Sequence, residues 1–388
     1  MRGAITQSPR RLPPEILDNI YSFRVVVDLP RKQNLGWIKV SHVCSYWRDV
    51  ALENTNLWTK INLDLGREWV SEMSMSAKQA SLVFKSSCME SSVQLITPHL
   101  PRARVIILSG IVDPFHNLQP IDAPAQIVEH VELSVRAEDN CITELPENLF
   151  ANHAPLLRTA YFSGLAIPWS STVFHNLTSL KVYGNSAENS SMPPYDTFFD
   201  ALSEMCYLET LLIYDALPPL SASTSDPLWD LAMFRSVVGR AQSLKRISLS
   251  KSILRPFCIA MKKDMDTTAP EQTPAESYSE HIPFPSLKVI HLHPLRVSNV
   301  SKLDRTVGFL TRVLRKRTTL RAPIRQIDII QPDLPEKWME ELRAVVPNVT
   351  WRGGRAADRF KFKSELFDAI SQRGTKCQSV GAENRDVT

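Results

Sequence analysis

The first sixty residues place apolar side chains at the spacing of amphipathic helices. A first helix is predicted to begin at the prolines after Leu12, because proline suits a first turn whose N–H groups have no intrahelical partner. Its apolar positions recur every three or four residues, at Ile16, Leu17, Ile20 and Phe23. A second helix with the same spacing is predicted from Ile38 to Leu52. So small a unit cannot bury all of these side chains alone, so we expect part of it to pack against a following domain or another protein.

Beyond about residue 100, the chain repeats a short alternation of apolar and polar positions. Each copy fits L-x-x-L-x-L, the strand half of a leucine-rich repeat. Successive side chains on a strand point to opposite faces, so the apolar positions should face a core and the intervening ones the other side. The copies cover residues 128–133, 157–162, 177–182, 208–213, 244–249, 287–292 and 324–329, with an earlier candidate at 103–108 and a terminal strand at 349–351.

The copies are unevenly spaced, unlike regular repeats of roughly 20–29 residues. Helices are therefore predicted between them, at 198–205, 228–238 and 303–317. The fold class that follows is α/β: a small helical domain, then an irregular leucine-rich-repeat solenoid with one parallel sheet. The predicted organisation is a flexible N-terminus at 1–11, a helical domain at 12–60, a helical linker at 61–100, the repeat domain at 101–354, and a C-terminal helix with a flexible tail at 355–388.

Composition narrows the class of protein. The 388 residues include 43% hydrophobic and 22% charged ones, which is typical of a globular chain. The 27 prolines against 12 glycines favour many short elements joined by stiff corners. We expect no signal peptide and no membrane span, since no apolar stretch is long enough. The cysteines stand far apart without a C-x-x-C pair, so we expect reduced thiols and a cytoplasmic or nuclear location.

The N-terminal unit resembles the F-box, particularly the form common in mushroom-type fungi. The resemblance covers residues 12–58 and rests on L-P-P-E-I-L, V-S-H-V-C-S-Y-W-R and a terminal Leu57-Trp58. It implies docking to a Skp-type adaptor and, through it, to a cullin-based ubiquitin ligase. The segment from Arg24 to Trp37 is longer than in the commonest F-boxes. The alternative is a helical cap on the repeats. The adaptor-facing residues that the resemblance implies are Leu12, Pro13, Ile16, Leu17, Ile20, Val40, Val43, Cys44, Trp47 and Trp58.

A second surface is predicted from the outward positions of the repeat strands. Tyrosine is enriched at interfaces, although strands favour aromatic residues in any case. We expect this face to bind a target protein, and its candidate residues are Tyr161, Lys181, Tyr183, Tyr214, His291, His293 and Asp328. The two histidines alone do not make a metal site, which needs three or four ligands. No metal or other cofactor is therefore predicted.

The sequence contains few features typical of an enzyme or of a nucleic-acid-binding protein. It has no phosphate-binding loop, nucleophile elbow or zinc-protease motif, so we expect no catalytic residue. The basic run between Arg312 and Arg325 could contact nucleic acid, but no aromatic residues interleave with it. The favoured function is substrate recognition for a cullin-type ligase. The alternatives are a leucine-rich-repeat scaffold without a ligase role and, less favoured, a basic-patch nucleic-acid binder.

Overall fold

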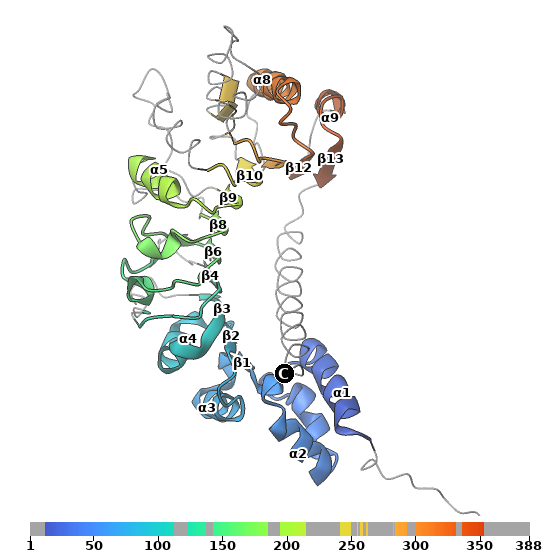
Figure 1. Cartoon of the computed structure of the whole chain (residues 1–388), viewed down its shortest axis with the longest axis vertical. Helices are drawn as coiled ribbons and strands as arrows, with labels where there is room; N and C mark the ends of the chain where they lie inside the picture. The colour runs from blue at the N-terminus through green and yellow to red at the C-terminus, as the bar shows by residue number, and fades with distance from the viewer. Residues whose placement is uncertain are drawn as a thin grey trace, which may run out of the picture. The chain divides into compact units, whose positions relative to one another are not determined.

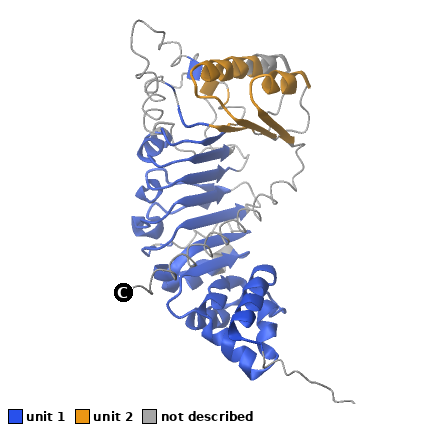
Figure 2. Ribbon diagram, turned by 45° about the vertical axis from the view of Figure 1, so that its right-hand side comes forward, with its two compact units in different colours: residues 1–248, 259–287 blue, residues 249–258, 288–388 orange. Residues whose placement is uncertain are grey.

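The structure is a computed structural model that describes residues 12–111, 121, 123–136, 143–184, 195–214, 241–249, 254, 257–258, 261–262, 282, 284–292, 300–330 and 336–352. The chain divides into two compact units (Figure 2). Unit 1 comprises Met1–Ser248 and Ile259–Leu287, and unit 2 comprises Leu249–Cys258 and Lys288–Thr388. No helix in the described ranges is long and apolar enough to cross a bilayer.

Unit 1 begins with four short helical segments, which are α1 (Pro14–Val27), the 3-10 turn η2 (Gly36–His42), α2 (Ser45–Glu53) and the 3-10 turn η3 (Thr55–Trp58). The single helix predicted from Ile38 to Leu52 is wrong in one respect. The backbone of Cys44 is fully extended and forms the N-cap of α2, so the helical conformation is interrupted between η2 and α2. Neither glycine nor proline marks this break in the sequence.

An aromatic cluster holds these segments together. The ring of Trp37 packs edge-on against Trp58 at 5.0 Å and against Tyr21 at 6.2 Å between centroids. The Tyr21 hydroxyl donates to the backbone oxygen of Trp47 at 2.8 Å, and Trp58 Nε1 donates to that of Ala51 at 2.8 Å. Burial, helped by the charges of Cys44 and Asp18, raises the pKa of Tyr21 to about 12, so its hydroxyl remains a donor at neutral pH. Edge-to-face pairs of this kind add to the stabilisation from area burial.

The long connection from α1 to η2 is folded tightly. Arg31 and Asn34 exchange backbone hydrogen bonds of 2.8 and 2.9 Å around a turn, and the Trp37 amide donates to Asp28 O at 2.8 Å. Gly36 precedes Trp37 with φ of +55°, and a Cβ there would lie 2.4 Å from Asp28 O. A glycine is therefore required to bring Trp37 into the cluster.

The rest of unit 1 is a stack of parallel strands backed by helices. In spatial order the strands are β1 (Lys60–Asn62), β2 (Leu82–Ser86), β3 (Ala103–Ile111), β4 (His130–Arg136), β6 (Thr159–Ser163), β8 (Ser179–Tyr183), β9 (Thr210–Tyr214) and β10 (Arg246–Leu249). Figure 1 shows α3 (Arg67–Ser76), α4 (Met89–Ile96) and α5 (Tyr195–Glu204) on one side of them. Short 3-10 turns η4 (Leu63–Leu65), η5 (Thr97–Arg102), η6 (Leu149–Asn152) and η7 (Thr172–Phe174) lie between the strands in sequence, and β5 (Thr143–Glu144) pairs with β7 (Leu165–Ala166).

Alternation along each strand separates a core face from a second face. On β6, Ala160 and Phe162 are fully buried, and the Phe162 ring lies 5.8 Å from that of Phe174 in η7. The intervening residues of β6 are only partly buried and point the other way. The same alternation recurs on β2 and β8, so all the repeats share one core.

Unit 2 repeats this arrangement with three parallel strands, β11 (Val289–Leu292), β12 (Gln326–Ile330) and β13 (Asn348–Arg352). The described helices of this unit include α8 (Val300–Thr319) and α9 (Glu336–Arg343). Ile290 and Ile327 are buried on the strands, as are Leu310 on α8 and Trp338 on α9. Arg317, at the end of α8, is also buried, and its Nε donates to Ala322 O at 3.1 Å. This arginine therefore does not belong to an exposed basic patch.

The predicted fold class is confirmed: a helical N-terminal unit precedes a solenoid of parallel strands and helices. Each L-x-x-L-x-L copy contains a strand that begins two residues after its first apolar position. Four strands were missed: β1 and β2, which lie at the start of and within the segment expected to be a helical linker, and the short strands β5 and β7. They lack the full repeat pattern, and polar residues surround the short alternation in β2. The helix predicted at 228–238, the flexible N-terminus predicted at 1–11, and the C-terminal helix and tail predicted at 355–388 lie outside the described residues. The domain boundaries stay predictions.

We predict that Gly36→Ala lowers the free energy of unfolding by about 2–4 kcal/mol, because it adds a backbone clash to an unfavourable φ. Gly66→Ala is the matched control. Gly66 also has a positive φ, +92°, but a Cβ there meets nothing within 4 Å, so the expected cost is about 1–2 kcal/mol. Urea denaturation of both variants measures the difference. Equal losses at the two positions would contradict the close approach of Asp28.

Candidate functional site

Helix α1 carries apolar side chains on two faces. Leu17, Tyr21 and Val25 are buried against the other helical segments. On the opposite side, Ile16 is 45% exposed and Phe23 is 68% exposed. Leu12, Val26 and Val27 are exposed as well, and so is Val43 at the start of the bend before α2. We call Leu12, Ile16, Phe23, Val26, Val27 and Val43 the exposed apolar surface of unit 1. Contiguous exposed apolar surface is uncommon on soluble monomers and marks interaction sites.

The structure divides the predicted adaptor-facing residues into three groups. Leu17 and Trp58 lie in the interior, so they hold the helices together and do not line the exposed surface. Leu12, Pro13, Ile16 and Val43 are exposed, whereas Ile20, Val40, Cys44 and Trp47 are partly buried. The sequence prediction omitted Phe23, Val26 and Val27. The spacing Leu12, Ile16, Ile20, Phe23, Val27 is the signal that could have found most of this stripe.

The second face of the strands in unit 1 is largely polar, although Ile107 on β3 and Leu212 on β9 also occupy outward positions. We call the outward positions of β2 to β10 the polar strand face, which includes Lys85, His130, Glu132, Tyr161, Lys181, Tyr183, Arg246 and Ser248. Register places Glu132 beside Tyr161 and Tyr161 beside Lys181, so these three side chains form one row across the strands. The Tyr161 and Tyr183 rings lie 5.4 Å apart. Tyr183 and Tyr214, two of the predicted face residues, are register partners.

Burial and neighbouring charges shift the pKa of three side chains on this face. Burial lowers the pKa of Lys181, Glu132 opposes this, and the nearby charge of Arg246 lowers it further. Burial and the charge of Lys181 lower the pKa of His130 to about 4, so this imidazole is neutral at pH 7. Burial is also the main cause that raises the pKa of Tyr161, with Tyr183 and Glu132 adding to it. Its hydroxyl therefore stays protonated.

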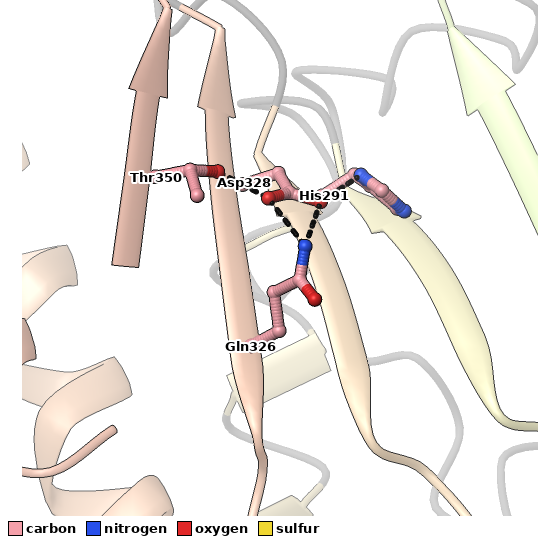
Figure 3. A network of polar contacts seen from close by, with 4 residues as sticks. All are labelled: His291, Gln326, Asp328 and Thr350. Carbon is pink, nitrogen blue, oxygen red and sulfur yellow. Dashed lines mark hydrogen bonds and ion pairs between the residues drawn. The ribbon is translucent and has the colours of Figure 1, made fainter. Parts of the chain in front are cut away.

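A compact polar network lies on the corresponding face of unit 2 (Figure 3). His291 Nδ1 is 3.1 Å from Asp328 Oδ2, and because a carboxylate can only accept, this nitrogen carries the proton. Gln326 Nε2 donates to both oxygens of Asp328 at 2.8 and 3.0 Å, and the Thr350 hydroxyl donates to Oδ1. Parallel register brings the network together, because it pairs His291 with Asp328 and Asp328 with Thr350. His293 lies outside the described residues.

The network holds Asp328 in its ionised form. Burial alone would raise the pKa of this carboxyl, but the hydrogen bonds from His291, Thr350 and Gln326 outweigh it and hold the pKa well below its usual range. In a neutral His291 the outer nitrogen, Nε2, is left as an acceptor. Two of the predicted face residues, His291 and Asp328, are therefore in direct contact, and Gln326 and Thr350 are two members that sequence reasoning missed. Whether this face binds a partner stays a prediction.

Comparison with known proteins identifies one part of the chain. Residues 10–64 match the F-box-like family. No curated protein matches the chain. Among solved structures, a protein from Bacteroides fragilis aligns with 71% of this chain at 11% identity and a TM-score of 0.39, and the chain spans 66% of the length of that protein. A likeness this distant carries no argument about function, so the F-box-like match is the informative one.

We predict that Asp328→Asn lowers the free energy of unfolding at pH 7 by about 1–3 kcal/mol, because an amide nitrogen then faces the donors around it. The carboxylate has a lower pKa in the folded state than its unfolded value near 3.9. Its stabilisation is therefore fully present above that value and is lost as the pH falls toward the folded-state pKa. Urea denaturation of both proteins between pH 7 and pH 3 should show the difference shrinking. A difference that does not change with pH would contradict this network.

Proposed function

We propose that this chain is a substrate-recognition subunit of a cullin-type ubiquitin ligase. In this proposal the F-box-like domain docks a Skp-type adaptor, which connects the chain to cullin, and the strand array captures a target protein. The F-box-like match at residues 10–64 carries the proposal, because adaptor docking is what this domain implies. F-box proteins are typically adaptors and not enzymes, so no catalytic residue is assigned to this chain.

The exposed apolar surface supports the adaptor-docking step. Ile16, Phe23 and Val43 are exposed to solvent although each has a large apolar side chain. Burying one such side chain contributes roughly 1.5–3 kcal/mol, so a partner that covers several of them gains substantial affinity. The aromatic cluster around Trp37 already fixes the helices before a partner arrives, which reduces the entropy lost on binding. We infer that Phe23, Val26 and Val27 extend the docking surface beyond the residues expected from the sequence.

The contribution of the chain to ubiquitin transfer would be proximity. A target held on the strand array, while the F-box-like domain holds the adaptor, stays near the conjugating enzyme bound elsewhere in the ligase. Tethering of this kind raises the effective concentration of the reacting groups without any local catalysis. A ligase of this class works in the cytoplasm or the nucleus, and we propose either compartment for this chain.

The test substitutes apolar residues that are exposed and leaves the buried ones unchanged. We predict that the Ile16→Asp/Val43→Asp double variant remains folded but binds a purified Skp-type adaptor at least about 100-fold more weakly, because it places two charges in an apolar contact. Met75→Asp is the matched control, since Met75 is 63% exposed on α3, away from the docking helices. Circular dichroism checks the fold, and calorimetric titration measures the affinity.

Retention of wild-type affinity by the folded double variant would refute docking through this surface. Leu17→Asp is unsuitable for the test, because Leu17 is fully buried and its replacement would unfold the helices. Adding cullin to the adaptor complex then separates a ligase subunit from a scaffold: a ligase subunit co-purifies with both proteins, and a scaffold only with the adaptor.

A further inference from the structure

We infer that the polar strand face of unit 1 captures an extended, carboxylate-rich segment of the target protein. The inference rests on the proposed function, because it takes this face as the surface that selects the target. It adds the chemical class of the partner, its approximate length and the pattern of its charges.

The first observation is the balance of charge along the face. Lys85 on β2, Lys181 on β8 and Arg246 on β10 all occupy outward positions, whereas Glu132 on β4 is the acidic residue among the described outward positions. Lys181 and Arg246 lie two strands apart, close enough for the charge of Arg246 to act on Lys181. Lys181 is partly buried and Arg246 is exposed, and an anion that lies between two neighbouring cations stabilises both.

Polar atoms that lack a protein partner lie on the same face. His130 on β4 is 3% exposed, and its Nδ1 makes no hydrogen bond. Ser248 on β10 is buried as well, and its hydroxyl likewise makes none. Buried polar atoms are normally paired, so each such atom calls for an explanation. A carboxylate that reached either group would supply an acceptor without displacing any hydrogen bond within the protein.

The strand order sets the length of the segment. From Lys85 to Lys181 the neighbouring strands are β2, β3, β4, β6 and β8. At about 4.8 Å between adjacent strands, Lys85 and Lys181 are separated by roughly 19 Å. An extended peptide covers about 3.3 Å per residue, so about six residues cross this distance, with Arg246 two strands beyond Lys181.

The position of Glu132 sets the charge pattern. Glu132 lies about midway between Lys85 and Lys181 in one row of register partners. It repels an acidic residue placed at the middle of the segment and tolerates acidic residues near both ends. A polyanion of uniform charge, such as a nucleic acid, would meet this repulsion wherever it crossed the row. The face therefore favours a peptide whose acidic residues are interrupted.

The experiment presents the full-length chain with pools of random decapeptides on beads. One pool carries fixed Glu residues near both ends, a second carries them at the middle, and a third carries Lys in place of Glu at the ends. A phosphoserine pool and a single-stranded oligonucleotide complete the set. We expect capture of the first pool above all others, with capture that weakens as salt rises.

Variants locate the binding on the face. Lys181→Gln/Arg246→Gln should weaken capture of the first pool about tenfold, because it removes two charges at one end of the segment. Arg67→Gln/Lys78→Gln is the control, since both side chains are exposed at α3, and it should leave capture unchanged. Glu132→Gln should act in the opposite direction and strengthen capture about threefold, most of all for the pool with Glu at the middle.

Equal capture of the Glu and Lys pools, capture of only the phosphoserine pool or of the oligonucleotide, or wild-type capture by Lys181→Gln/Arg246→Gln would each overturn the inference. Titration of every variant with the Skp-type adaptor runs in parallel. Loss of peptide preference with intact adaptor binding refutes only the inference about the strand face. Failure of the wild-type chain to bind the adaptor refutes the proposed function instead.

Discussion

Helix α1 has apolar side chains on two faces, and the described part of the chain packs against only one of them. Leu17, Tyr21 and Val25 are buried in the helical unit, and the rings of Tyr21, Trp37 and Trp58 fix that packing. Ile16 and Phe23 stay in contact with water on the other face. A helix arranged in this way is stable without a partner and still presents a surface that gains free energy when a partner covers it. The function proposed for the whole chain depends on this division.

The two candidate surfaces of unit 1 differ in their physical character. Binding through the exposed apolar surface depends on burial of hydrocarbon. Such binding requires no particular geometry between the contacting groups, but an introduced charge weakens it. The polar strand face depends on charges and hydroxyl groups that parallel register brings into rows, and such interactions select a partner more than they add affinity. The proposed function needs both kinds of surface. The apolar one would bind an adaptor that is the same for every target, and the polar one would select the target. Alternation along the strands makes this possible, because it sends the apolar residues to the core and leaves the other face to vary.

Periodicity in the sequence was enough to predict the class of fold. Most strand positions followed from L-x-x-L-x-L, and α8 followed from the stripe of Leu303, Val307, Leu310 and Leu314 in the sequence. Periodicity could not show which apolar face of α1 has a partner within the chain, since Ile16 and Leu17 are adjacent and chemically alike, yet one is exposed and the other fully buried. The extended backbone of Cys44 gave no signal, because neither glycine nor proline stands at the break. The network at Asp328 joins three strands that are distant in sequence, so it required the register that only the structure provides.

Titration of the full-length, wild-type chain with a purified Skp-type adaptor, by calorimetry at several temperatures, tests the central claim most directly. The account predicts a saturable 1:1 complex with a negative heat-capacity change, which is the signature of apolar surface leaving water. Absence of heat and of complex formation, from a chain that circular dichroism shows to be folded, would contradict it. A complex whose heat capacity does not change on binding would equally contradict docking through the exposed apolar surface of α1.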